Sequence, residues 1–188
     1  KSRDGIELRL KSKRRLAGVV VAGGGPVPGA RLELVSASGP FHSEVHSAVA
    51  GPDGRFELSV MPSELPMVVT AEAGAWPLAI VRVDSVERDV VVAFPAEAGE
   101  VVLRDLGPRL PQEPEGSYSG LLLVRDGLPV SLWQHAGLGP LRTSVTGGGA
   151  LEARVRIAPG PVVVCAGTVP ELSAVLAGAR SSARCAQG

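Results

Sequence analysis

The stretch LAGVVVAGGGPVPGARLEL, residues 16–34, decides the fold class, because it places two β-type segments on either side of a turn rich in glycine and proline. In its last four residues, RLEL, leucines alternate with charged residues, as they do in a strand with one buried face. We therefore expect an all-β protein. The same two-residue period recurs in GIELRL at 5–10, RFELSV at 55–60 and LEARVRI at 151–157.

Turn signals separate these segments at roughly the 8–12 residue spacing that is typical of a β-sandwich. The segment GPRLPQEPEG at 107–116 has the composition of a semi-rigid linker between two units. We therefore predict a basic N-terminal strand at 1–12, a β-sandwich at 13–106, the linker, and a second, divergent β-sandwich module at 117–188. Clusters of glycine, proline and aspartate predict turns at 23–29, 51–54, 126–127, 147–149 and 159–161.

One segment near 169–177 favours a helix or another strand about equally. Thr168 can cap a helix that has Pro170 in its first turn and stops at Gly178. The apolar residues at helical spacing are Leu172, Val175 and Leu176.

Composition excludes several classes of protein. The chain has 188 residues with 19 basic and 19 acidic side chains and six aromatics, which argues against a nucleic-acid binder. Hydrophobic residues make up 45% of the chain, too many for a disordered segment. No uncharged stretch reaches the roughly 18–20 apolar residues that a membrane-spanning helix needs.

Charge is concentrated at the N-terminus. Residues 1–15 hold seven basic and two acidic side chains, including all three lysines, so the remainder of the chain carries a compensating negative charge. This basic arm is either a charged edge strand that resists aggregation or a contact for an acidic partner surface.

Cys165 and Cys185 are the only cysteines. No CxxC or Cys/His spacing typical of zinc sites is present. Cys165 and Cys185 are either a disulfide pair, which would indicate an oxidising compartment outside the cytoplasm, or two free thiols.

Gly18 and Val20 are followed by PVPGA at 26–30 and by DGRF at 53–56. Through these residues the segment 14–105 resembles the carboxypeptidase regulatory-like family. The resemblance implies two tandem Ig-like or prealbumin-like β-sandwich modules without catalytic function, of the kind appended to secreted, periplasmic or cell-surface bacterial proteins. Beyond residue 116 it is reduced to DGLPV at 126–130 and VVVCAG at 162–167.

Candidate chemistry is sparse. His42, Glu44 and His46 share one face of a strand and could bind a transition metal, but side chains on one strand rarely converge and this segment is expected to face solvent. In GSYSG at 116–120 the central position holds Tyr118, not the serine of an esterase elbow. We therefore assign no catalytic residue, metal ligand or cofactor, and expect no enzymatic activity.

Two tryptophans remain as candidate ligand contacts. Trp76 lies between Gly74 and Pro77, and Trp133 lies near His135. Each ring either stacks on a carbohydrate or packs within or between modules.

The leading hypothesis is a non-catalytic extracytoplasmic structural or interaction protein, serving as a spacer, stalk or filament subunit. If Ile6, Leu8 and Leu10 find no place in their own sheet, they could complete a sheet in a neighbouring subunit by strand addition. The expected partners are neighbouring modules or identical subunits. The alternative is a module that binds a carbohydrate or cell-surface polymer through Trp76 and Trp133.

Overall fold

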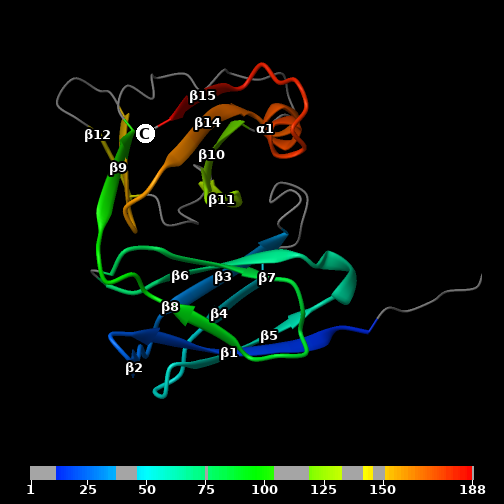
Figure 1. Ribbon diagram of the computed structural model, residues 1–188, viewed down its shortest axis with the longest axis vertical. Helices are drawn as coiled ribbons and strands as arrows, with labels where there is room; N and C mark the ends of the chain where they lie inside the picture. The colour runs from blue at the N-terminus through cyan, green and yellow to red at the C-terminus, as the bar shows by residue number, and fades with distance from the viewer. Residues whose placement is uncertain are drawn as a thin grey trace, which may run out of the picture.

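The computed structural model describes residues 12–36, 46–74, 76–103, 119–132, 142–145 and 151–187. Within these ranges the chain is mostly β, which confirms the all-β prediction (Figure 1). The strands are β1 (Arg14–Ala22), β2 (Gly25–Pro26), β3 (Arg31–Ser36), β4 (His46–Val49), β5 (Arg55–Val60), β6 (Met67–Glu72), β7 (Ala79–Val83), β8 (Val90–Ala93), β9 (Gly99–Leu103), β10 (Ser119–Arg125), β11 (Leu128–Leu132), β12 (Arg142–Val145), β13 (Leu151–Ile157), β14 (Val162–Thr168) and β15 (Arg184–Gln187). A 3-10 turn, η1 (Pro62–Glu64), and one helix, α1 (Val169–Leu176), complete the described elements.

Strands β1 to β8 form an N-terminal unit of two packed sheets. In the first sheet, which we call the outer sheet, β1 pairs antiparallel with β2 and β5 and parallel with β8. The second sheet, which we call the middle sheet, has the order β4-β3-β6-β7 with all neighbours antiparallel. The alternating apolar residues predicted at 31–34 and 55–60 meet between these sheets, where Leu32, Leu34 and Phe56 are buried in one cluster.

Two glycines permit the close packing around Phe56. A Cβ on Gly18 would lie 2.2 Å from the carbonyl oxygen of Val90 and 2.6 Å from the Phe56 ring. Gly54 has a φ of +75°, and a Cβ there would lie 2.7 Å from the carbonyl oxygen of Val20. Both positions therefore require glycine, one for a close approach between strands and one for the turn.

Strands β9 to β15 form a C-terminal unit, also with two sheets. One sheet has the order β12-β13-β9 and the other the order β11-β10-β14-β15. Leu123 of β10 and Val155 of β13 are buried together between the two sheets. Leu122, the residue next to Leu123, points to the opposite face of its sheet, where α1 covers it through Leu172.

The helix alternative at 169–177 is confirmed by α1. The Thr168 hydroxyl accepts a hydrogen bond from the Glu171 N–H at 3.4 Å, and the Glu171 carboxylate accepts one from the Thr168 N–H at 2.8 Å. This reciprocal capping box begins the helix, and Gly178, with φ +67°, lies just after its end.

Strand β9 departs from the predicted division of the chain. We assigned residues 99–103 to the first module, but β9 pairs with β13, with Val101 opposite Val155. The chain therefore passes into the C-terminal unit before the predicted linker. Residues 107–116 lie outside the described residues, and the rest of the predicted division stays a prediction.

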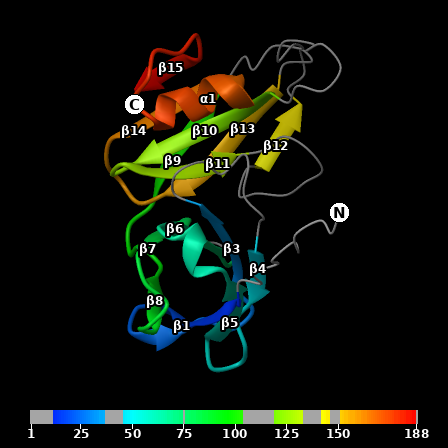
Figure 2. The same cartoon turned by 90° about the vertical axis from the view of Figure 1, so that its right-hand side faces the viewer.

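The middle sheet lies between the outer sheet and the C-terminal unit (Figures 1 and 2). This position explains why β6 is buried along almost its whole length. Met67 and Val69 face the interior of the N-terminal unit, whereas Val68 and Thr70 are buried on the other face, and β11 contacts β6 and β7. The middle sheet therefore contacts β11, an edge strand of the C-terminal unit, through this second face.

Candidate functional site

The junction between the units centres on Leu78. Its backbone N–H donates a hydrogen bond of 2.6 Å to the carbonyl oxygen of Arg156, and Leu78 forms an isolated parallel bridge with Ile157 of β13. Its side chain is only 4% exposed, because it joins the apolar cluster of the C-terminal unit. A residue of the N-terminal unit thus completes the core of the C-terminal one.

A groove with a volume of about 770 Å³ lies beside this junction. Arg31 and Glu72, which stand opposite each other on β3 and β6, line its wall in the N-terminal unit. In the C-terminal unit, Arg154 of β13 reaches Glu100 of β9 through an Nη1–Oε2 contact of 3.1 Å. The complete lining is Gly29, Arg31, Glu72, Ala73, Gly74, Trp76, Leu78, Glu100, Arg154, Val155 and Arg156.

Trp76 lies in this groove. The turn before it is closed by a hydrogen bond of 3.0 Å from the Trp76 N–H to the carbonyl oxygen of Ala73. The indole stacks on the buried ring of Phe94, with centroids 6.1 Å apart and planes inclined by 27°. The residue nevertheless remains 44% exposed. Trp76 therefore contacts one aromatic neighbour and keeps a part of its surface accessible to a ligand.

Glu33 lies on the same face of β3 as Arg31, the face opposite to the buried leucines of that strand. Burial raises the pKa of the Glu33 carboxyl above its ordinary value. The ionised form of this side chain is therefore disfavoured near the junction.

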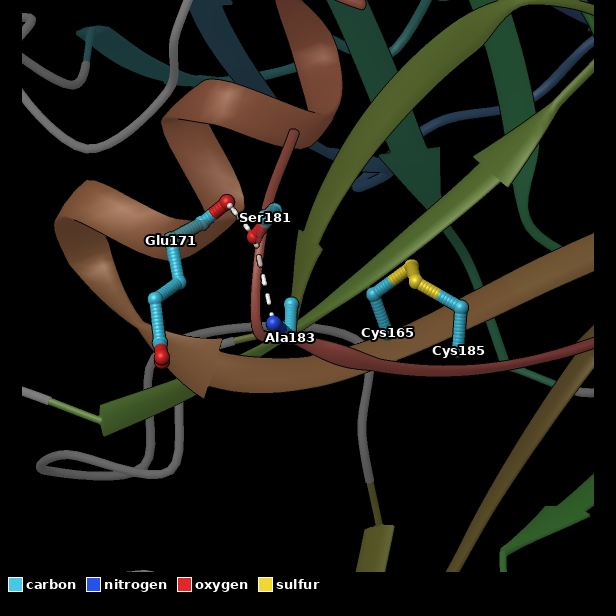
Figure 3. Close-up of a disulfide and its surroundings, with 5 residues drawn as sticks. All are labelled: Cys165, Glu171, Ser181, Ala183 and Cys185. Carbon is cyan, nitrogen blue, oxygen red and sulfur yellow. Dashed lines mark hydrogen bonds between the residues drawn. A yellow bond between two sulfur atoms is a disulfide. The ribbon is translucent and has the colours of Figure 1, made fainter. Parts of the chain in front are cut away.

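Cys165 and Cys185 form a disulfide, as one of the two alternatives predicted (Figure 3). They are directly opposed on β14 and β15, with Cα atoms 4.0 Å apart. Cys165 is fully buried beside Leu122 and Leu172, whereas Cys185 is exposed. The bond therefore ties an exposed terminal strand to the buried face beneath α1.

Polar contacts hold the connection between α1 and β15. The Ser181 hydroxyl donates a hydrogen bond of 2.7 Å to the carbonyl oxygen of Glu171 and accepts one of 3.1 Å from the Ala183 N–H (Figure 3). Two hydrogen bonds lower the pKa of the Glu171 carboxyl. The larger effect comes from the Ser182 hydroxyl and the smaller one from the Thr168 backbone N–H.

The expectation that the segment containing His46 faces solvent is wrong for His46 itself. The side chain is 9% exposed, and its Nε2 lies 3.4 Å from Oε2 of Glu64 without a hydrogen bond. The physical reason is register: His46 stands opposite the buried Leu34, so it lies on the inward face of β4. Among the described residues, no three potential metal ligands lie together.

Several sequence candidates lie outside the described residues. These are Ile6, Leu8 and Leu10 of the proposed strand-addition segment, His42, Glu44, Trp133, and residues 116–118 of GSYSG. At the end of the basic arm, Arg14 contacts Glu87 at 2.7 Å and Arg15 pairs with Glu57. Both pairs are exposed and within the N-terminal unit, so they contribute little to stability.

The sequence did not predict the charged residues of the groove as candidate site residues. Arg31, Glu72, Glu100 and Arg154 appear there as ordinary charged positions of alternating strands. Only the packing of one unit against the other gathers them, and no local motif encodes that packing.

The chain matches no family model and no curated protein. One solved structure that is similar is a DUF3823 family protein from Parabacteroides merdae, with 13% identity and a TM-score of 0.37, covering 85% of this chain and 92% of that one. Within the described part of the chain, no helix is both long and apolar enough to cross a membrane.

Proposed function

We propose that this chain is a non-catalytic structural or interaction module of an extracytoplasmic protein, in which two β-units act together as one rigid spacer. The observation that carries the proposal is the junction at Leu78, which combines a backbone hydrogen bond to Arg156 with burial in the core of the C-terminal unit. Units joined only by a flexible linker would move independently. Here the same residue belongs to the framework of both units.

The disulfide supports the extracytoplasmic part of the proposal. Disulfides persist in oxidising compartments and are rare in the cytoplasm of mesophiles. The Cys165–Cys185 bond fastens β15, all four residues of which are exposed. A strand that lacks buried side chains gains most from such a covalent tie in an environment that preserves it.

Small-angle X-ray scattering of the full chain tests the rigid spacer. We expect a single compact profile for the native protein and a larger radius of gyration for Leu78→Asp, which places a charge in the shared cluster. Val91→Asp is the matched control, because Val91 is 57% exposed on β8. A native profile typical of two flexibly linked bodies would contradict the proposal.

Assembly into a filament is the finer part of the proposal. The segment 5–10 precedes β1 and alternates apolar with polar residues, the pattern of a strand that can add to the edge of another sheet. Light scattering should show that deletion of residues 1–12 converts an oligomer into a monomer. An oligomeric state that survives the deletion would rule out strand addition through this segment.

A further inference from the structure

We propose that the groove between the two units is a binding site for an uncharged oligosaccharide, with Trp76 as the stacking platform. The groove volume of about 770 Å³ lies within the range of about 300–1,000 Å³ that is typical of small-molecule sites. Trp76 is the one strongly exposed aromatic side chain among the described residues, and it lies in this groove.

The accessible indole can bind the apolar face of a sugar ring. Sugar rings present C–H groups on their faces, and an aromatic ring offers those groups a flat apolar surface of negative potential. Phe94 supports Trp76 from within the N-terminal unit, at a centroid distance of 6.1 Å. The platform is thus oriented before a ligand arrives, which lowers the entropic cost of binding.

The charged side chains of the groove can form hydrogen bonds with the hydroxyl groups of a sugar. Hydroxyl groups both donate and accept hydrogen bonds, so a sugar needs partners of both kinds. The guanidinium groups of the three arginines that line the groove donate, and the carboxylates of Glu72 and Glu100 accept. The contact of 3.1 Å between Arg154 and Glu100 shows how opposite charges hold each other in place along the wall.

The same charge pattern argues for an uncharged ligand. The lining holds charges of both signs, three arginines (Arg31, Arg154 and Arg156) and two glutamates (Glu72 and Glu100). An anionic ligand would be repelled by the two carboxylates, and this repulsion would offset part of its attraction to the arginines. A cationic ligand would be attracted by the glutamates but repelled by the arginines. A polyhydroxylated neutral ligand uses both signs of charge without this penalty.

Fluorescence titration of the full chain tests the site. In a Trp133→Phe background, Trp76 is the remaining tryptophan, so its emission reports on the groove directly. Neutral oligosaccharides, chosen by screening a glycan array of neutral and acidic chains, should change this emission in a saturable manner. The change should persist in high salt, because no net charge is neutralised.

Variants of the platform give the decisive comparison. Trp76→Ala should weaken binding on the array about tenfold, and Trp76→Phe should fall between it and the native chain, because phenylalanine offers a smaller aromatic surface for stacking. Val91→Ala, on an exposed position of β8 outside the groove, should bind as the native chain does.

Three results would overturn the proposal. They are the absence of binding to any neutral glycan, binding only to acidic glycans or to peptides, and equal affinity of Trp76→Ala and the native chain. None of these results bears on the rigid spacer, which scattering tests without ligand.

Discussion

At the scale of single residues, Gly18 is the position where a minimal change should cost most. Gly18→Ala adds a methyl group that would lie 2.2 Å from the Val90 carbonyl oxygen and 2.6 Å from Phe56. The β1–β8 pairing or the Phe56 ring must then shift. We expect the free energy of unfolding in urea to fall by about 1–3 kcal/mol, the range for overpacked cores.

Gly25→Ala is the matched control for Gly18→Ala. A Cβ on Gly25 has its nearest neighbour, the carbonyl oxygen of Ala22, at 3.9 Å, and Gly25 is not among the glycines with positive φ. The free energy of unfolding of this variant should lie within about 0.5 kcal/mol of that of the native chain. Equal stability of the two variants would show that β1 does not approach β8 so closely.

Glu33 offers a prediction about pH. Its pKa is raised by burial, so its contribution to stability is greatest below the ordinary value of 4.5 and is lost as the pH rises through the folded-state pKa. Glu33→Gln removes the charge that must be desolvated. By calorimetry it should raise Tm by about 1–2 °C at pH 7, and the gain should vanish below pH 4.

The exposed Glu57, which pairs with Arg15 on the surface, supplies the control for Glu33. Glu57→Gln should not raise Tm at pH 7, because no buried charge is removed. A Glu33→Gln variant that is less stable than the native chain at pH 7 would mean that the carboxylate makes a favourable contact.

Sequence pattern predicted the residues whose role is local, and missed those whose role depends on distant contacts. Phe56 and Gly54 follow from the turn and the alternation around them. The inward position of His46 depends on its register with Leu34, and the burial of Glu33 depends on which unit covers that face of β3. Neither the register nor the covering surface is visible in a short window of sequence.

At the scale of elements, β15 depends on its disulfide. All four of its residues are exposed, so the strand is held by its pairing with β14 and by the bond from Cys185 to Cys165. Reduction should lower the free energy of unfolding by about 3 kcal/mol, the chain-entropy value for a loop of this length. Hydrogen exchange should become faster in β15 first.

Helix α1 serves as the internal reference for the reduction experiment. Its capping box and its buried Leu172 do not involve Cys185, so we expect both to persist after reduction. Amide protection in α1 should therefore fall less than in β15. Unchanged exchange throughout β15 after reduction would mean that backbone pairing alone holds the strand.

At this scale, α1 confirms one of the two alternatives predicted for 169–177, whereas β9 was assigned to the first module and pairs in the C-terminal unit. Thr168, Pro170 and Gly178 are capping signals that act within a few residues, so they can be read directly. Strand β9 looks like the end of the first module, yet its partner β13 lies about 50 residues further along the chain. Strand pairing at that separation is a property of the whole fold.

At the scale of the whole molecule, Leu78 makes the two units thermodynamically dependent on each other. It is anchored to the N-terminal unit by its position before β7 and is buried with Leu123, Val155 and Ile157 of the C-terminal unit. Unfolding of either unit would expose part of the other's core. We therefore expect the native chain to unfold in one cooperative transition, with circular dichroism and intrinsic fluorescence coincident.

Leu78→Ala should break this dependence. The truncation leaves a cavity at the junction and should lower the free energy of unfolding by about 2–5 kcal/mol. Because the lost contacts are those that couple the units, the single calorimetric transition should separate into two. Val91→Ala, at an exposed site, should keep one transition near the native Tm. Two transitions already present in the native chain would refute the coupling, and with it the structural basis of a rigid spacer and of a groove preformed between the units.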